Sequence, residues 1–140
     1  MKIVNDLLNT KAGLPIPELD ATTTVIDALT FMESENLSYV VVTNRGAYAG
    51  IFSQKDYAQK VVLMNKNSYT SLIGEALSTD LPAIDLDDTT QTCWMLMTAY
   101  KTTYLPAFHN FSFRGVVTIT DVLNEAMLQV DAEPEGEKVF

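Results

Sequence analysis

The stretch that decides the fold is GVVTITD, residues 115–121, together with its near copy GIFSQKD at residues 50–56. In both, a glycine and two apolar residues of strand type lead to a hydroxyl residue, Thr118 or Ser53, and an aspartate follows three positions later. The pattern Ser/Thr-x-x-Asp after an apolar run is typical of a capping box, in which hydroxyl and acid close the first turn of a helix. Each stretch therefore predicts a buried strand that turns sharply into a helix.

The two stretches belong to an internal repeat with a period of 65 residues. Sliding the chain against itself by this distance needs no gap and pairs identical residues along the whole repeat. The identical pairs are Pro17/Pro82, Asp20/Asp85, Thr24/Thr89, Met32/Met97, Tyr39/Tyr104, Gly50/Gly115, Asp56/Asp121 and Leu63/Leu128. Because a repeat fixes the architecture, we expect repeat 1 at residues 1–65, repeat 2 at residues 66–130 and an acidic, flexible tail at residues 131–140.

Each repeat is predicted to form a short strand, a helix, two paired strands and a second helix. Apolar residues with helical spacing follow a capping-box start, and β-type runs flank turn residues. The buried stripe is Val25, Ala28, Leu29 and Met32 in repeat 1, and Thr90, Cys93, Trp94 and Met97 in repeat 2. The paired strands are residues 39–43 with 49–53 and residues 104–108 with 113–118, and residues 71–77 form a short connecting helix.

The predicted fold class is α/β of the α+β type, with two tandem repeats. One repeat alone buries too little apolar surface to be stable. We therefore expect the two repeats to pack about a pseudo-twofold axis and to form two related clefts.

Composition narrows the classes of function and location. With 18 acidic and 9 basic residues the net charge is −9, which repels nucleic acid and anionic membranes. No apolar run approaches the roughly 20 residues of a membrane helix, and Asp6 interrupts any secretory signal. The single cysteine, Cys93, cannot form an internal disulfide. We expect a cytoplasmic protein without nucleic-acid or membrane partners.

The two Ser/Thr-x-x-Asp elements allow two interpretations. In the first, each hydroxyl and acid only caps its own helix. In the second, the free N–H groups at the helix start and the hydroxyl bind a phosphate, and the carboxylate accepts the two hydroxyls of a ribose. The second interpretation predicts a nucleotide site in each repeat.

These residues resemble those of a known family. The repeated Gly-h-h-Ser/Thr-x-x-Asp pattern, together with FSQKDYAQKVVL at residues 52–63, is similar to a tandem pair of CBS (cystathionine-β-synthase) domains, a Bateman module of the small stand-alone bacterial type. The resemblance covers about residues 1–130 and implies no required cofactor and an adenosine-containing ligand such as AMP, ADP, ATP, NAD or S-adenosylmethionine. The ligand residues that it implies are Ser53, Asp56 and Lys55 with Tyr39, Val40 and Val41, and Thr118 and Asp121 with Thr103, Tyr104, Leu105 and Pro106. Residues before the first strand of each repeat, among them Ile16, Leu81 and Pro82, are implied to close the pockets.

The chain departs from the family pattern in its positive charges. Many members carry Arg or His just before the Leu-Pro strand, where this chain has LSY and TTY. Lys55 stands where an Arg often precedes the aspartate, whereas Thr120 occupies the matching place in repeat 2. Lysine keeps the charge but lacks the planar fork of arginine. We therefore expect two unequal sites.

Other chemistries find little support in the sequence. Cys93 and His109 are the only cysteine and histidine, too few soft ligands for a structural metal, and no catalytic constellation is present, so we expect no enzyme. Asp85, Asp87 and Asp88 are interpreted as a helix cap.

Two hypotheses remain: a regulatory nucleotide-binding module that acts on a protein partner, or a degenerate scaffold that binds a partner without a nucleotide. Surplus apolar residues on the outer helix faces, Trp94 and the Met-rich segment 95–97 among them, predict association, and the family resemblance implies a homodimer.

Overall fold

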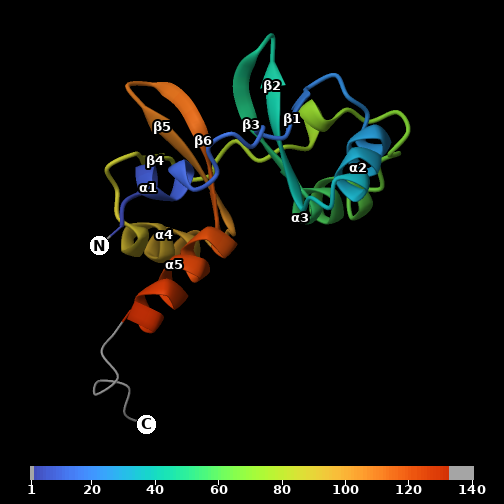
Figure 1. Cartoon of the computed structure of the whole chain (residues 1–140). Helices are drawn as coiled ribbons and strands as arrows, with labels where there is room; N and C mark the ends of the chain where they lie inside the picture. The colour runs from blue at the N-terminus through green and yellow to red at the C-terminus, as the bar shows by residue number, and fades with distance from the viewer. Residues whose placement is uncertain (1, 133–140) are drawn as a thin grey trace. The chain divides into compact units, whose positions relative to one another are not determined.

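The computed structural model describes residues 2–132 and divides into two compact units (Figure 1). Unit 1 comprises Met1–Leu14 and Leu81–Phe140, and unit 2 comprises Pro15–Asp80. The units differ from the predicted repeats in the segment that begins each repeat. The residues that begin each repeat join the other one, so the N-terminal 14 residues belong with repeat 2 and residues 66–80 with repeat 1.

Unit 2 is built on a three-stranded sheet of order β1-β2-β3. Its elements are β1 (Glu18–Asp20), α2 (Val25–Ser34), β2 (Tyr39–Asn44), β3 (Ala47–Ser53), α3 (Gln54–Tyr57), a π-helical turn η1 (Ala58–Val62) and a 3₁₀ turn η2 (Ile73–Glu75). Strand β1 pairs with β2 in parallel, and β2 and β3 form an antiparallel hairpin.

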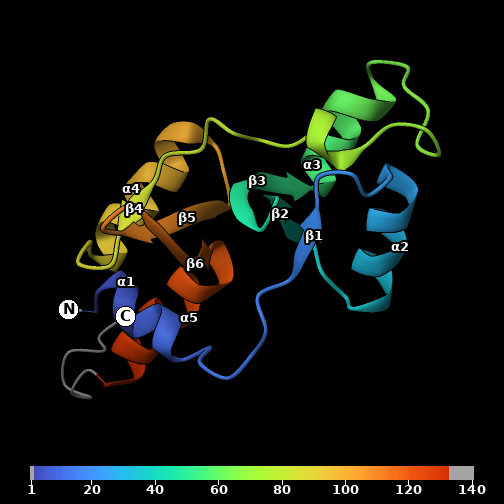
Figure 2. The same ribbon diagram turned by 90° about the horizontal axis from the view of Figure 1, so that it is seen from above.

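Unit 1 repeats this plan with a sheet of order β4-β5-β6 (Figure 2). Its elements are α1 (Val4–Asn9), β4 (Ile84–Asp85), α4 (Thr90–Tyr100), β5 (Tyr104–His109), β6 (Ser112–Thr118) and α5 (Ile119–Ala132). The predicted order of strand, helix, hairpin and helix is confirmed in both units, as is the mixed α and β class. Helix α1 was not predicted.

Each unit has its own apolar core, formed between its sheet and the inner faces of its helices. The predicted stripe of α2 is correct, since Val25, Ala28 and Met32 are buried. The stripe predicted for α4 is wrong at Trp94, which is 48% exposed, although Cys93 and Met97 are buried. Leu29, the repeat counterpart of Trp94, is partly buried against the core of unit 2, so the exposure of Trp94 reflects what packs beside the helix rather than the helical spacing.

The segments that begin each repeat dock through matching hydrogen bonds. In unit 1, Val4 N donates to Asp88 O at 2.8 Å. In unit 2, Ile73 N donates to Thr23 O at 2.9 Å, and Thr23 is the repeat counterpart of Asp88. We call residues 3–11 and residues 72–78 the leading segments.

Helix α5 continues through Asp131 and Ala132, the first two residues of the predicted tail, and residues 133–140 lie outside the described part of the chain. Within residues 2–132, the structure contains no helix with the length and hydropathy needed to cross a bilayer.

Candidate functional site

The acid of unit 2, Asp56, is part of a saturated polar cluster. Its Oδ2 accepts hydrogen bonds from the backbone N and the hydroxyl of Ser53, both at 2.9 Å. Its Oδ1 accepts a hydrogen bond from the hydroxyl of Ser78 at 2.6 Å and forms an ion pair with Lys60 Nζ at 3.0 Å. An ionised carboxylate has about four acceptor positions, and all four are used here.

The lysine of this cluster is saturated as well. Lys60 Nζ also donates to Leu77 O at 3.0 Å and to the Ser78 hydroxyl at 3.3 Å, so its three protons all have acceptors. The Asp56 side chain is only 6% exposed. A ligand that approached Asp56 would have to displace bonds that the fold has already made.

The acid of unit 1, Asp121, lies in the first turn of α5 and has fewer partners. Its Oδ2 accepts from Thr118 N at 2.8 Å and from Lys11 Nζ at 2.7 Å. Its Oδ1 has no hydrogen bond to any residue that the structure describes, and its side chain is 14% exposed. One oxygen of this carboxylate is therefore open to a donor from solvent or a ligand.

The hydroxyl of unit 1, like its acid, has fewer hydrogen-bond partners than its counterpart in unit 2. Ser53 Oγ both accepts from Asp56 N at 3.3 Å and donates its proton to the same side chain. Thr118 Oγ1 accepts from Asp121 N at 3.3 Å, and within residues 2–132 its proton has no recorded acceptor. The capping box thus forms in both units, and only in unit 1 does it keep a spare donor and a spare acceptor.

The predicted strand residues meet these clusters through the sheet register. Tyr39 is the cross-strand partner of Ser53, and Tyr104 is the partner of Thr118. Thr103 O accepts from the backbone N of the first residue of α5, at 2.9 Å. Val40, Val41, Leu105 and Pro106 are buried, and Val41 N already donates to Pro17 O, so a ligand does not reach these four residues in this arrangement.

The remaining predicted residues precede the first strand of each unit or lie on α3. Ile16 is 40% exposed and precedes Pro17, whose carbonyl accepts from Val41 N at 2.7 Å. Leu81 and Pro82 are half-buried and lead into β4. Lys55 is exposed on α3, and the ion pair of Asp56 is made with Lys60 instead.

The sequence analysis missed the two lysines that neutralise the acids. Lys60 could have been found, because residues four apart on a helix are neighbours and Lys60 follows Asp56 at that spacing. Lys11 is 110 residues from Asp121 and comes from a leading segment, so no local pattern connects the two. Ser78, the third missed residue, also belongs to a leading segment and is positioned by reciprocal backbone bonds with Ile51.

Both halves of the chain also match a known protein family. The family model of the CBS domain matches this chain twice, at residues 4–63 and at residues 73–128. The chain belongs to the CBS-domain family. Proteins of this family are generally regulatory and typically non-catalytic.

Individual relatives of this CBS pair agree with the match. The "CBS domain-containing protein CBSX3, mitochondrial" of Arabidopsis thaliana is 28% identical in an alignment of 105 residues that covers 71% of this chain and 51% of that protein. The chain thus matches about half the length of that curated relative. A solved CBS-domain protein from Burkholderia ambifaria MC40-6 is similar with a TM-score of 0.83 at 25% identity, covering 95% of this chain and 98% of its own.

A more distant CBS structure shows the same fold. The hexameric CBS-CP12 protein from bloom-forming cyanobacteria has a TM-score of 0.75 at 15% identity, and the match covers 96% of this chain and 77% of that one. At this identity the likeness concerns the fold alone.

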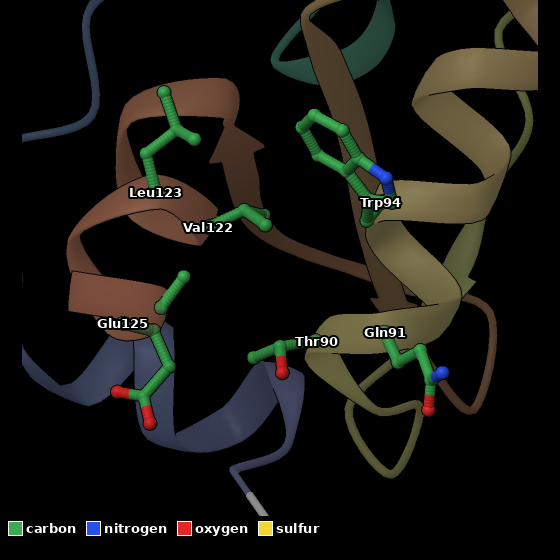
Figure 3. A pocket seen from close by; sticks show the side chains of 7 residues that line it. Thr90, Gln91, Trp94, Val122, Leu123 and Glu125 are labelled. Atoms are coloured by element: carbon green, nitrogen blue, oxygen red, sulfur yellow. The ribbon is translucent and has the colours of Figure 1, made fainter. Parts of the chain in front are cut away.

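The CBS pair also has a hollow of about 450 Å³ between α4 and α5 of unit 1 (Figure 3). The indole of Trp94 faces Val122 and Leu123 across it, and the carboxylate of Glu125 lies toward the other end (Figure 3). Thr90, Gln91 and Ala126 complete the lining, which contains none of the predicted ligand residues. The hollow is therefore distinct from the Thr118 and Asp121 cluster.

The other candidates from the sequence have structural explanations. Burial raises the pKa of Cys93 to about 11, with Asp88 and Asp121 adding to the effect, whereas a nucleophilic thiol needs a lowered pKa. His109 Nδ1 is 3.8 Å from Asp85 Oδ1. Among the described residues no cluster of three or more side chains suits a metal ion. The helix cap of α4 is Thr89 rather than the acidic cluster, whose members bond to one another's backbone.

Proposed function

We propose that this CBS pair is a regulatory module that binds one adenosine-containing nucleotide, at the Thr118 and Asp121 site of unit 1. The observation that carries the proposal is the open oxygen of Asp121, which lies beside a hydroxyl with a proton to donate. A ribose diol needs an acceptor, and a phosphate needs a donor. The corresponding site in unit 2 is closed by its own side chains.

The surroundings of Asp121 support a nucleotide rather than a small ion. The start of α5 is the positive end of a 14-residue helix, which favours a phosphate, although Thr118 N, Ile119 N and Asp121 N already donate within the unit. The beginning of β5 lies across from Thr118 in the sheet, and Thr103 just before it is exposed, so we expect an adenine to lie at this end of the sheet. Family membership supports the regulatory role, because CBS-domain proteins are generally regulatory.

The output of such a module is a shift between two arrangements of the protein. A ligand can shift that equilibrium only through its differential affinity for the two states, typically 1 to 3 kcal/mol. We propose that the shift changes affinity for a protein partner in the cytoplasm, with the chain acting as a homodimer and without catalysing a reaction.

Isothermal titration calorimetry with AMP, ADP, ATP, NAD and S-adenosylmethionine tests this proposal on the full chain. We expect one binding event per chain for at least one of these ligands. Asp121→Ala should weaken it at least tenfold because the diol loses its acceptor. The matched variant Asp56→Asn, in the closed site, should leave affinity within twofold of the wild type. Absence of binding to all five ligands, or loss in Asp56→Asn alone, would contradict the proposal.

A second function is favoured by a different surface. Five large apolar side chains on α4 and α5 are about half exposed or more, and two of them, Trp94 and Leu123, line the hollow. The five are Trp94, Met95, Leu123, Met127 and Leu128. Exposed apolar patches of this kind mark interaction sites. The alternative is therefore a dimeric scaffold that binds a protein partner through this face without a nucleotide.

Light scattering and calorimetry separate the two functions. If the scaffold function holds, Trp94→Ala or Met127→Lys should abolish self-association or partner capture, and no nucleotide should bind at millimolar concentration. If nucleotide binding persists when association is lost, the module does not act as a scaffold alone.

A further inference from the structure

The position of Lys11 is fixed by the fold of unit 1. Its backbone N donates to Leu8 O at 3.0 Å, and its carbonyl accepts from Leu14 N at 3.0 Å. The leading segment that carries it is anchored by Val4 and Leu7, which are buried in the core of unit 1. The ammonium group is therefore held at the site rather than sampling solvent as an ordinary surface lysine does.

At that position Lys11 makes two hydrogen bonds. Its Nζ donates to Val116 O at 2.8 Å and to Asp121 Oδ2 at 2.7 Å. An ammonium has three protons, and in the described part of the chain the third has no recorded acceptor. The Lys11 side chain is 33% exposed, so it lies at the surface of unit 1.

The charge of Lys11 changes what the site can accept. A bare Asp121 carboxylate in a chain of net charge −9 would repel a phosphate. Lys11 cancels that charge and leaves Oδ1 free as an acceptor. The pair therefore offers a hydroxyl acceptor and a cationic donor side by side.

We propose that Lys11 is the anion-selecting residue of the unit 1 site, and that the ligand is an adenosine nucleotide with a phosphate on the ribose that Asp121 holds. This inference rests on the proposed function. The ammonium lies beside the carboxylate that would hold the ribose, so a phosphate on that sugar would be the ligand's anionic group nearest to it. It discriminates against neutral adenosine and against S-adenosylmethionine, which carries a sulfonium charge and no phosphate. Lys11 thus replaces the Arg or His that the chain lacks before β5.

Calorimetry with AMP and adenosine on four full-length proteins tests the role of Lys11. These are the wild type, Lys11→Met, Lys11→Arg and the matched control Lys60→Met from the closed site. We expect Lys11→Met to weaken AMP binding about tenfold and adenosine binding less than twofold, because only the charge-assisted bond to phosphate is lost. Lys11→Arg should retain the preference for AMP, and Lys60→Met should change neither affinity.

A measurement on the wild type alone gives the same information should Lys11→Met fail to fold. Raising the salt concentration screens the ammonium, so AMP affinity should fall with salt while adenosine affinity stays constant. Equal weakening of both ligands in Lys11→Met with salt-independent AMP binding would make Lys11 a purely structural residue. Tighter binding of both ligands in that variant would make Lys11 a competitor for Asp121, and either result overturns the inference. If the wild type binds S-adenosylmethionine and none of the four ligands that carry a phosphate on the ribose, the proposed function stands and this inference falls.

Discussion

The two acid sites arise from one sequence pattern and differ in what the rest of the chain brings to them. Asp56 is surrounded by Ser53, Ser78 and Lys60, which occupy every acceptor position of its carboxylate. Asp121 keeps one oxygen open. A motif shared by two repeats therefore specifies the local turn, whereas residues outside the motif decide whether the site is closed or available.

The closing groups come from positions that the repeat does not match. Lys60 and Lys11 lie in the first repeat, and their counterparts in the second repeat are Glu125 and Ala76. Each acid is paired with a lysine nonetheless. Neutralising a largely buried carboxylate is thus a common requirement of the two units, met by a helix residue in one and by a leading segment in the other.

The largest expected difference between the sites is in stability. Asp56→Ala would leave the Lys60 ammonium, the Ser78 hydroxyl and Ser53 N without their acceptor, and we expect a loss of about 3 kcal/mol in the free energy of unfolding. Asp121→Ala removes two bonds at a more exposed position and should cost about 1 to 2 kcal/mol. Urea unfolding followed by circular dichroism measures both. Equal losses would show that the two clusters contribute equally to stability, and a larger loss for Asp121→Ala would reverse the expected order.

A smaller difference is expected at the glycines that begin the two motifs. A Cβ on Gly50 would overlap Leu77 Cδ1 and lie 2.5 Å from Ser78 O, so the backbone of the leading segment would have to move. A Cβ on Gly115 would lie 3.2 Å from Leu8 Cδ2, a side chain that can adjust, although a φ of 154° disfavours alanine there. We expect Gly50→Ala to cost about 2 kcal/mol and Gly115→Ala about 1 kcal/mol.

The Gly50 variant also tests how the unit 2 site is closed. Displacing Ser78 removes a donor from Asp56 and opens that carboxylate. Hydrogen exchange at Ile51 N, which donates to Ser78 O, should therefore accelerate in Gly50→Ala. Unchanged exchange would mean that the leading segment adapts without leaving the strand.

The sequence predicted the repeated plan because its signals are local. Helical spacing, turn residues and two capping boxes lie within a few positions of one another, and all of them formed. Trp94 was misplaced because an exposed and a buried apolar residue look alike on a helix that packs on only one side. The number of hydrogen bonds that each carboxylate accepts could not be predicted, because it depends on Ser78 and Lys11, which lie in the leading segments far from these acids in the sequence.

The smallest expected difference lies at the hairpin tips, where the two units use different residues in the same backbone conformation. Arg45 and Gly46 have φ of 53° and 80°, and Asn110 and Phe111 have φ of 50° and 64°. Two-residue hairpin loops with positive φ favour glycine, and a bulky residue there is strained. Phe111 is fully exposed, so burial does not compensate for the strain.

Phe111→Gly should therefore stabilise unit 1 by about 0.5 to 1 kcal/mol, and the reciprocal Gly46→Phe should destabilise unit 2 by a similar amount. Trp94, the single tryptophan of the chain, reports on unit 1 by its fluorescence in urea, while circular dichroism follows both units. Destabilisation by Phe111→Gly would mean that the phenyl ring makes a contact in solution that the isolated chain does not have. Because the two tips share one conformation, the reciprocal variant separates that contact from the intrinsic preference of the turn.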